Sequence, residues 1–366
     1  MAFFGSKTVL GLDIGTSSVK VVEMTKSSGR FVLQNYGILA LAPGAAALKV
    51  SAEQAVTTGT VRLSEEDIAW AVRTVLEKSK IESREAMVSI PSYPTFTTVI
   101  TMPYVSEEEI AKAIPYEARK YVPVPLSDVV LDWSIINVNG PAKGGIVSDP
   151  KLQKDNPASV EVFLVAVPKE EIKRYQTIMK LAVLTMKVLE LESFALVRAI
   201  VGNDLSPLAV INIGGRSTSI VIVDGGVERI NHDFEIGGSE VTKSIAQMLK
   251  ISSTEAEELK RVEGLKSDRA DLIAAIADKV DKIVLETKKV VQNYEETKKV
   301  KIAKIMLVGG LANMPGLIEY FQNKASINVT LGNALARVIV APELAPIQNE
   351  LNLTLAVAVG LAMRET

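Results

Sequence analysis

Apolar and polar positions alternate along two strand–turn–strand segments that lie far apart in the chain. Residues 8–14 form a largely apolar run, and residues 19–23 resume it after the turn Gly-Thr-Ser-Ser at 15–18. Residues 210–224 repeat this order around the turn Gly-Gly-Arg-Ser-Thr at 214–218. Because β-branched residues dominate the flanking runs, the pattern predicts two β-hairpins with small, hydroxylated turns.

A third glycine turn, Gly309-Gly310, joins an apolar run at 305–308 to a helical pattern at 315–324. Glycine lets another group approach the backbone closely, and successive amide N–H groups suit an anionic oxygen. One such turn is equally well explained as an ordinary hairpin, but its recurrence favours a phosphate site. In the first hairpin, Asp13 could hold a hydrated divalent cation and Lys20 could supply positive charge.

The rest of the chain contains helices and a block of different character. The apolar period of 3.6 residues predicts helices at 169–182, 194–201, 239–250, 267–297, 315–324 and 352–363. The block at 84–169 combines proline-punctuated strands with a helix that Ser106 begins, and Pro115 inside that helix predicts a kink. Polar residues at 139–159 predict a hairpin tip, and residues 40–60 a loop.

These patterns predict a chain in four parts. Residues 1–83 together with 170–205 form a first domain, and residues 84–169 form an inserted α+β subdomain. Residues 206–350 form a second domain, and residues 351–366 form a closing helix that returns to the first domain.

Composition narrows the class of function. The chain has 366 residues, enough for two domains. Its formal net charge of −2 lacks the excess of positive charge that binding to nucleic acid or to an anionic membrane would require. It has no cysteine, which excludes disulfides and thiolate sites, and the single histidine, His232, excludes a cluster of histidine ligands. No signal peptide or membrane span is evident, so we expect a cytoplasmic protein without direct membrane insertion.

Two phosphate-type hairpins combined with a Gly-Gly turn resemble the actin-like ATPase superfamily. The resemblance implies two similar domains that clasp ATP and Mg²⁺ in the cleft between them. The expected fold class is therefore α/β, an actin-like (ribonuclease H-like) two-domain fold with a small inserted α+β subdomain.

The inserted block carries a more specific resemblance. Residues 113–132, which include Ile114-Pro115-Tyr116-Glu117-Ala118-Arg119-Lys120-Tyr121-Val122-Pro123-Val124-Pro125, are similar to the signature of the PilM family of type IV pilus assembly proteins. The opening Phe3-Phe4-Gly5 is similar to that family too. The resemblance implies ATP and Mg²⁺ as cofactors, and a groove at the insert for the N-terminal cytoplasmic peptide of PilN, an inner-membrane pilus protein.

The family resemblance also implies a place in the pilus inner-membrane assembly complex. PilN and PilO are the implied members of that complex, and the assembly ATPase is a further candidate. The chain would then lie at the inner-membrane face through its partner. Tyr116, Tyr121, Pro123 and Pro125 either line the peptide groove or merely shape the insert.

The resemblance implies nucleotide contacts at matching positions. The first phosphate motif corresponds to Asp13, Gly15, Thr16, Ser17, Ser18 and Lys20, with Asp13 as a Mg²⁺ ligand through water. The second corresponds to Asn212, Gly214, Gly215, Ser217 and Thr218, followed by Gly237 and Gly238. Glu257 and Lys260 match the ribose and adenine helix, although a solvated helical face explains them equally well. Gly309, Gly310, Leu311 and Met314 match the adenosine motif.

Asn212 departs from the superfamily pattern, in which many members have an acidic residue in the second hairpin. A neutral amide neither accepts a proton from an attacking water nor attracts hydrated Mg²⁺ as a carboxylate does. Since phosphoryl transfer depends mostly on positioning and charge stabilisation, we expect ATP to bind and to be hydrolysed slowly or not at all.

The alternative is an FtsA-type division protein that polymerises at the membrane. FtsA proteins end in a linker and a basic amphipathic helix, whereas this sequence ends in Ala362-Met363-Arg364-Glu365-Thr366. We therefore expect a membrane-recruited adaptor rather than a self-anchoring filament. Self-assembly stays an alternative, because actin-like folds often stack end to end.

Overall fold

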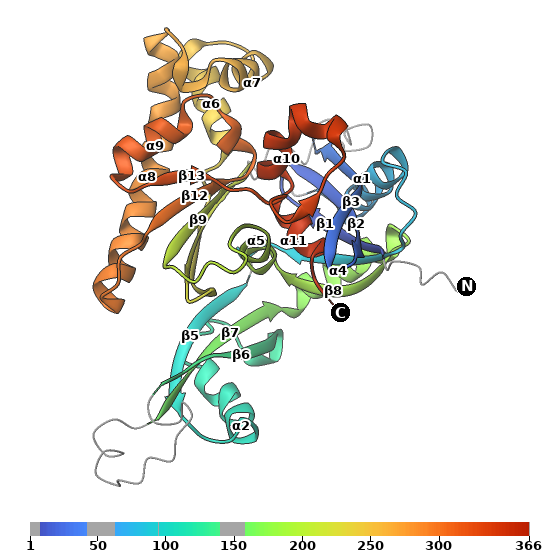
Figure 1. Cartoon of the computed structure of the whole chain (residues 1–366), viewed down its shortest axis with the longest axis vertical. Coiled ribbons are helices and arrows are strands. Elements are labelled where there is room, and N and C mark those ends of the chain that lie inside the picture. The colour runs from blue at the N-terminus through green and yellow to red at the C-terminus, as the bar shows by residue number, and fades with distance from the viewer. Residues whose placement is uncertain (1–7, 42–62, 94, 140–157, 366) are drawn as a thin grey trace.

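The computed structural model describes residues 8–41, 63–93, 95–139 and 158–365. Nearly all of the predicted loop at 40–60, most of the predicted tip at 139–159, and Phe3-Phe4-Gly5 lie outside these residues. Two β-sheets with flanking helices stand beside one another, and a third, smaller sheet projects away from them (Figure 1).

The first sheet has six strands in the order β14-β3-β2-β1-β4-β8. Their bounds are β1 (Thr8–Ile14), β2 (Ser18–Ser27), β3 (Arg30–Ala40), β4 (Glu85–Ile90), β8 (Thr185–Leu191) and β14 (Val338–Ile339). β1, β2 and β3 are antiparallel, whereas β1, β4 and β8 are parallel. The flanking helices are α1 (Glu65–Lys78) and α4 (Lys169–Leu181) on one face, and α5 (Glu192–Ile200) and α11 (Ala356–Ala362) on the other.

The second sheet repeats this topology in the order β11-β10-β9-β12-β13. Its strands are β9 (Leu208–Ile213), β10 (Thr218–Asp224), β11 (Val227–Phe234), β12 (Lys304–Val308) and β13 (Val329–Leu331). β9, β10 and β11 are antiparallel, and β9, β12 and β13 are parallel. The accompanying helices are α6 (Gly238–Leu249), α7 (Ser253–Val262), α8 (Ala270–Lys298) and α9 (Leu317–Ala325). The repeated hairpin pattern of the sequence is thus one part of a duplicated sheet.

The third sheet belongs to the insert, the part of the chain from β5 to β7. It comprises β5 (Phe96–Pro103), β6 (Val129–Asn139) and β7 (Ser159–Pro168), paired antiparallel in the order β5-β7-β6. α2 (Glu107–Ala118) packs on this sheet through Ile110 and Ile114, which share a separate core with Ile100, Val162 and Leu164. The part from β5 to β7 is thus a small α+β subdomain with its own core, whereas β4, at the start of the predicted block 84–169, belongs to the first sheet.

Local sequence signals account for the helix starts. The Ser64 hydroxyl accepts a hydrogen bond from the Asp67 amide at 3.1 Å and caps α1. Ser106 and Glu109 form a reciprocal capping box at the start of α2. α2 continues through Pro115, so this residue does not end the helix. The helices predicted after the insert are present as α4, α5, α6, α8 and α9.

The predicted closing helix at 352–363 is wrong in one respect, because the structure has two short helices there. α10 (Gln348–Thr354) packs against β12 and the 3₁₀ turn Gly310–Asn313, whereas α11 packs against α5 and β1. The break at Leu355 lets each half bury its apolar side chains against a different sheet. This segment therefore bridges the two sheets.

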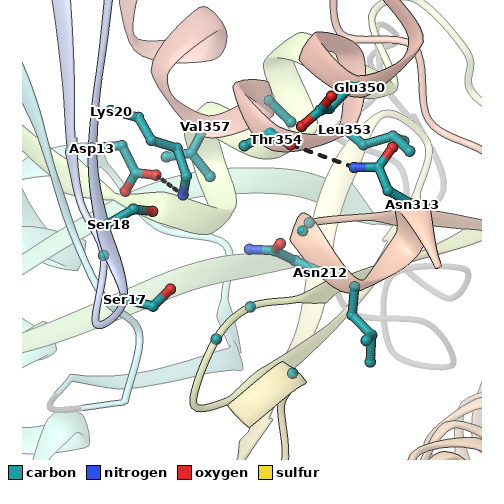
Figure 2. A pocket seen from close by; sticks show the side chains of 18 of the residues that line it. Asp13, Ser17, Ser18, Lys20, Asn212, Asn313, Glu350, Leu353, Thr354 and Val357 are labelled. Atoms are coloured by element: carbon teal, nitrogen blue, oxygen red, sulfur yellow. Dashed lines mark hydrogen bonds and ion pairs between the residues drawn. The ribbon is translucent and has the colours of Figure 1, made fainter. Parts of the chain in front are cut away.

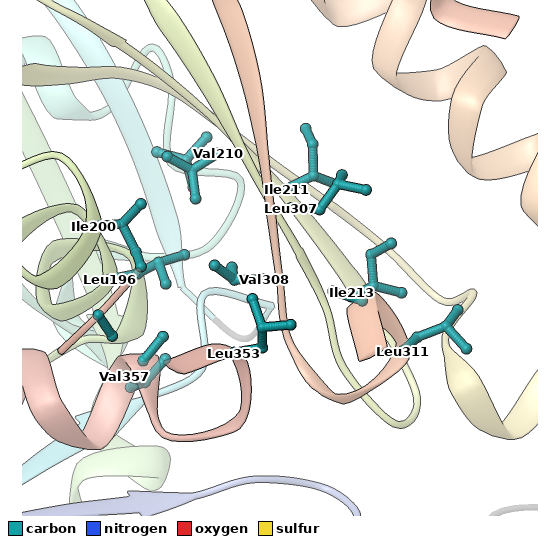
Figure 3. Packing of buried hydrophobic residues seen from close by; sticks show 14 of the residues in the cluster. Leu196, Ile200, Val210, Ile211, Ile213, Leu307, Val308, Leu311, Leu353 and Val357 are labelled. Atoms are coloured by element: carbon teal, nitrogen blue, oxygen red, sulfur yellow. The ribbon is translucent and has the colours of Figure 1, made fainter. Parts of the chain in front are cut away.

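One hydrophobic cluster is continuous between the sheets (Figure 3). Leu196 of α5 and Val357 of α11 lie in it together with Ile211 of β9, Val308 of β12 and Leu353 of α10. Burial of this apolar surface holds the two sheets against α5 and the C-terminal helices.

Two glycines let the backbone of α11 pack directly against the backbones of α5 and β1. A Cβ atom on Gly360 would lie 1.8 Å from the Ala195 carbonyl oxygen of α5. A Cβ atom on Gly11 of β1 would lie 2.2 Å from the Ala358 carbonyl oxygen. Any larger residue at either position would therefore push α11 away from α5 or from the first sheet.

We predict that Gly360→Ala lowers the free energy of unfolding by about 1–3 kcal/mol or more, the range for overpacking a core. The gain in helix propensity on replacing glycine, about 1 kcal/mol, opposes this loss but does not cancel it. Thermal unfolding followed by circular dichroism measures the change. Gly310→Ala is the control, because a Cβ atom there meets nothing within 4 Å. An unchanged unfolding midpoint for Gly360→Ala would contradict the contact.

Candidate functional site

A cleft of about 920 Å³ lies where the two sheets face each other. The β1–β2 hairpin forms one wall, and the β9–β10 hairpin with the start of α6 forms the other. Figure 2 shows Asp13, Ser18 and Lys20 on the first wall, with Asn212 opposite. The 3₁₀ turn Gly310–Asn313 and the C-terminal helices close one end.

The first turn is closed by its own backbone and backed by an ion pair. The Gly15 amide donates to the Ser18 carbonyl oxygen at 3.0 Å. Asp13 and Lys20 are paired residues across the hairpin, and the Lys20 ammonium lies 3.0 Å from the Asp13 carboxylate. The Ser89 hydroxyl donates to the second carboxylate oxygen of Asp13 at 3.1 Å. Asp13 is 4% exposed, so its orientation is fixed before any ligand arrives.

The second turn has the same backbone closure and is fastened to a helix. The Gly214 amide donates to the Ser217 carbonyl oxygen at 2.9 Å. The amides of Gly238 and Ser239, at the start of α6, donate to the carbonyl oxygens of Gly214 and Gly215 at 2.9 and 2.8 Å. The N-terminus of α6 is therefore positioned directly behind this turn, where its dipole favours an anion.

Two residues of the second motif support the turn rather than line the cleft. Thr218 is fully buried, and its hydroxyl donates to the Ile236 carbonyl oxygen at 2.7 Å. A Cβ atom on Gly237 would lie 2.7 Å from the carbonyl oxygens of Gly214 and Gly215, so this glycine packs beneath them. Thr218 and Gly237 therefore do not line the cleft, contrary to the prediction.

The two turns meet across the cleft. A Cβ atom on Gly215 would lie 2.3 Å from the Ser17 hydroxyl oxygen, so the side chain of one turn packs on the backbone of the other. The cleft is thus closed at the phosphate-type turns. A ligand between them would contact amides and hydroxyls from both sheets.

Lys260 is buried between α7 and α6 and does not lie on a solvated helical face. It is 7% exposed, and its ammonium donates to the Gly238 carbonyl oxygen at 3.2 Å and the Thr242 hydroxyl at 2.9 Å. Its third partner is the Glu257 carboxylate at 2.5 Å. Lys260 therefore ties α7 to the first turn of α6, beside the cleft.

Gly309 sits where no side chain fits. Its φ of +89° is a left-handed conformation, and a Cβ atom would lie 2.7 Å from the Asn212 side-chain oxygen. Its amide donates to the Leu353 carbonyl oxygen at 3.0 Å, which links β12 to α10. Leu311 and Met314, which follow in the turn, are buried with apolar faces toward the cleft.

The structure brings most of the predicted residues together at this cleft. Those that line it are Asp13, Gly15, Thr16, Ser17, Ser18, Lys20, Asn212, Gly214, Gly215, Ser217, Gly238, Glu257, Lys260, Gly309, Gly310, Leu311 and Met314. Their shared position supports one site, and their roles as ligands stay predictions.

Sequence reasoning missed Glu192 and the C-terminal wall of the cleft. Glu192 lines the cleft at the start of α5, where burial raises the pKa of its carboxyl to about 8 and the charges of Asp13 and Asp233 add to the rise. Glu350 and Thr354 of α10 also line the cleft, at its C-terminal wall. The Asn313 side-chain amide donates to the Thr354 hydroxyl at 3.5 Å (Figure 2). An acidic residue at a helix start is common, so Glu192 carried no distinctive signal.

A smaller cavity of about 270 Å³ lies between the insert and α5. Phe163 of β7 and Phe194 of α5 form one wall, with ring centroids 5.3 Å apart. Glu228 of β11 forms part of the floor. On the outer surface of the insert, Tyr116 and Tyr121 are exposed and line neither this cavity nor the cleft.

Buried polar atoms without partners surround Glu228. Both of its carboxylate oxygens, the Ser193 hydroxyl and the Asn231 side-chain oxygen are enclosed and make no well-formed hydrogen bond. Burial raises the pKa of the Glu228 carboxyl to about 8, although Ser193 and Asn231 lie close enough to oppose part of this rise. The neutral acid is therefore the favoured form at pH 7.

We predict that Glu228→Gln stabilises the protein more at pH 9 than at pH 6. In the unfolded chain the glutamate ionises at its ordinary pKa, so the folded protein holds an extra proton between that value and about 8. Stability is therefore lost as the pH rises through this window, and glutamine avoids the loss. Thermal midpoints at the two pH values measure it.

Glu235→Gln, at a half-exposed position just beyond β11, is the control for this pH comparison and should shift the midpoint equally at both pH values. An equal effect of Glu228→Gln at pH 6 and pH 9 would contradict the raised pKa.

Two structural features are absent from the residues that the structure describes. Within the described residues, no three histidine, aspartate or glutamate side chains gather as a metal site. None of the helices in that part of the chain is long and apolar enough to cross a membrane.

Comparison with known proteins gives a consistent result. A sequence profile of the family "Type IV pilus assembly protein PilM" matches residues 11–366. The cell division protein FtsA of Enterococcus faecalis (strain ATCC 700802 / V583) is 23% identical over 356 residues, 88% of this chain and 78% of that protein.

Solved structures show the same fold. The structure described as "PilM-PilN type IV pilus biogenesis complex" has a TM-score of 0.79 at 22% identity, and the match covers 97% of this chain and 98% of that chain. The ethanolamine utilization protein EutJ from Carboxydothermus hydrogenoformans has a TM-score of 0.55 at 15% identity, over 99% of this chain and 91% of that one. These matches confirm the expected α/β actin-like fold. The chain belongs to the PilM family of type IV pilus assembly proteins, in the actin-like ATPase superfamily and distantly related to FtsA.

Proposed function

We propose that this protein is an ATP-binding adaptor of the type IV pilus inner-membrane assembly platform. The observation that carries the proposal is the meeting of two phosphate-type turns across one cleft, with Ser17 packed on Gly215. Each turn presents amides and hydroxyls, and the start of α6 adds a helix dipole. These are the donors that a triphosphate requires.

The cleft also fits the other parts of the nucleotide. The buried Leu311 and Met314 provide an apolar surface for a base, and Glu257 provides a carboxylate near the ribose position. The fixed carboxylate of Asp13 would hold Mg²⁺ through water, with phosphate oxygens supplying the remaining ligands, because Mg²⁺ retains several waters in such sites. When bound, Mg²⁺ would neutralise charge on the phosphates.

We further propose that ATP is hydrolysed slowly or not at all. Asn212 lies where the second hairpin faces the first, and its amide is no base. Slow chemistry would leave ATP in place as a clamp between the two sheets, consistent with an adaptor rather than a motor.

The partner in this proposal is the N-terminal cytoplasmic peptide of PilN, and the solved PilM–PilN complex resembles this chain over nearly its whole length. We place the peptide in the cavity between the insert and α5. Its aromatic wall at Phe163 and Phe194 suits the apolar side chains of a peptide. Binding there would hold a cytoplasmic protein at the inner-membrane face, next to PilN and PilO.

Calorimetric titration of the protein with the N-terminal PilN peptide tests the adaptor proposal. We expect saturable binding in the presence of ATP and Mg²⁺ and weaker binding without nucleotide, because ATP favours the closed cleft. Asp13→Ala should lower the affinity for ATP·Mg²⁺ by at least about tenfold, because it removes the carboxylate that would hold the hydrated Mg²⁺. Asp281→Ala, on the outer surface of α8, is the control and should bind ATP as the unmodified protein does.

Absence of peptide binding under every condition would overturn the adaptor proposal. Binding of the peptide with equal affinity in the presence and absence of ATP would make the nucleotide a purely structural clamp.

We predict that Asn212→Asp increases the rate of ATP hydrolysis by about tenfold or more, because a carboxylate can act as a general base and draw Mg²⁺. Phosphate release under single-turnover conditions measures the rate. Asn313→Asp makes the same chemical change at the other end of the cleft and should leave the rate unaltered. Rapid ATP hydrolysis by the unmodified protein, or an unchanged rate of hydrolysis for Asn212→Asp, would contradict the role given to Asn212.

A further inference from the structure

An ion cluster joins the insert to the second sheet. Glu161 of β7 is 8% exposed, and its carboxylate accepts from the Arg229 guanidinium of β11 at 2.8 Å and from the Lys298 ammonium at the end of α8 at 3.0 Å. Burial alone would raise the pKa of Glu161, but hydrogen bonds from Lys298 and Asn137 and the charges of Lys298 and Arg229 hold it below its usual value. The carboxylate is thus ionised, and the two cations supply the contacts that come from outside the insert.

The insert itself is anchored to the first sheet. β4 ends at Ile90 and β5 begins at Phe96, while β7 ends at Pro168 and leads directly into α4. Phe163 packs on Phe194 of α5, which fastens the insert to the same unit. Any rotation of the second sheet relative to the first must therefore change the distances from Glu161 to its two cations.

β11 connects this cluster with the nucleotide cleft. Arg229 lies near the start of the strand, and Asp233 and Phe234 lie at its other end. Asp233 pairs with Ser219 across the sheet and accepts a hydrogen bond from the Ser219 hydroxyl, and Ser219 lines the cleft. A second contact, from the Asn231 amide to the Ser92 hydroxyl at 2.7 Å, crosses the same seam between Glu161 and the cleft. One strand, whose pairing register with β10 shifts at Arg229, therefore contacts both sites.

The ion cluster and the closed cleft occur in the same arrangement of the two sheets, since Ser17 packs on Gly215 while Glu161 holds both cations. We propose that Glu161, Arg229 and Lys298 form a latch that stabilises the closed cleft, so that occupation of the cleft and the position of the insert are coupled. This inference rests on the proposed binding of ATP in the cleft, and it assigns to the insert a direct influence on nucleotide affinity.

The latch acts through a population of conformations. If the closed arrangement binds ATP, loss of the latch lowers the closed fraction, and the apparent affinity falls by the same factor. Since a buried carboxylate deprived of a cation is strongly disfavoured, removal of either partner also pushes the sheets apart. Closure by ATP would in turn favour formation of the latch, because coupling between two sites is reciprocal.

Two measurements on the full chain test the latch. The first is the dissociation constant of ATP·Mg²⁺ for Glu161→Gln, which keeps the side-chain shape and removes the charge. We expect an increase of about three- to tenfold, although Glu161 does not line the cleft. Lys298→Gln removes one cation from a half-exposed position, should fold normally, and should show a smaller increase.

The second measurement needs no nucleotide. Because the chain has no cysteine, Lys112→Cys on α2 and Gln292→Cys on α8 give two unique positions for spin labels, both exposed. We expect pulsed electron paramagnetic resonance to show one short distance in the otherwise unmodified protein, and a longer or broader distribution with Glu161→Gln. ATP·Mg²⁺ should restore the short distance.

Glu295→Gln is the matched control. Glu295 also accepts from a lysine, Lys301 at 2.6 Å, but both residues belong to the second-sheet unit. It should change neither the ATP affinity nor the label distances. Unchanged affinity and unchanged distances with Glu161→Gln would overturn the latch. If the unmodified protein binds no ATP, the proposed function fails, whereas the label distances without nucleotide still decide on the latch.

Discussion

The hydrophobic contact between α5, α11 and the central strands of the second sheet is the constraint on which the rest of the structure depends. Val357 of α11 and Leu353 of α10 pack in the same cluster as Ile211 and Val308. Without this shared core, the two sheets would be linked mainly by turns and polar contacts. The core therefore fixes where the two glycine turns can meet.

The two turns have the same backbone and different chemistry. Each is closed by a glycine amide that donates to the carbonyl three residues later, at 3.0 Å for Gly15 and 2.9 Å for Gly214. The first has Asp13 at the equivalent strand end, with a cross-strand lysine, whereas the second has Asn212. The two turns thus share one backbone closure, whereas the ion pair between Asp13 and Lys20 has no counterpart at Asn212.

The parts of this structure that were predictable from sequence are those encoded locally. The β1–β2 and β9–β10 hairpins follow from alternating residues around glycine. The ion pair between Asp13 and Lys20 was not predicted, because it depends on the register of the first hairpin. The burial of Lys260 was not predictable, because it depends on the packing of α7 against α6. Glu192 and the α10 wall were missed for the same reason, and the contacts of Glu161 depend on how three separate elements are arranged.

The bridging position of α10 and α11 also has a consequence for biosynthesis. β1 leaves the ribosome long before α11, which covers one of its faces, and the Leu353 carbonyl accepts from the Gly309 amide only after α10 has been made. Contacts between such distant parts of a chain form slowly. One apolar face of the first sheet therefore stays uncovered until α11 has been synthesised, and during that time it is exposed to chaperones and to aggregation. The shared core and the cleft would thus be completed together in a single late step.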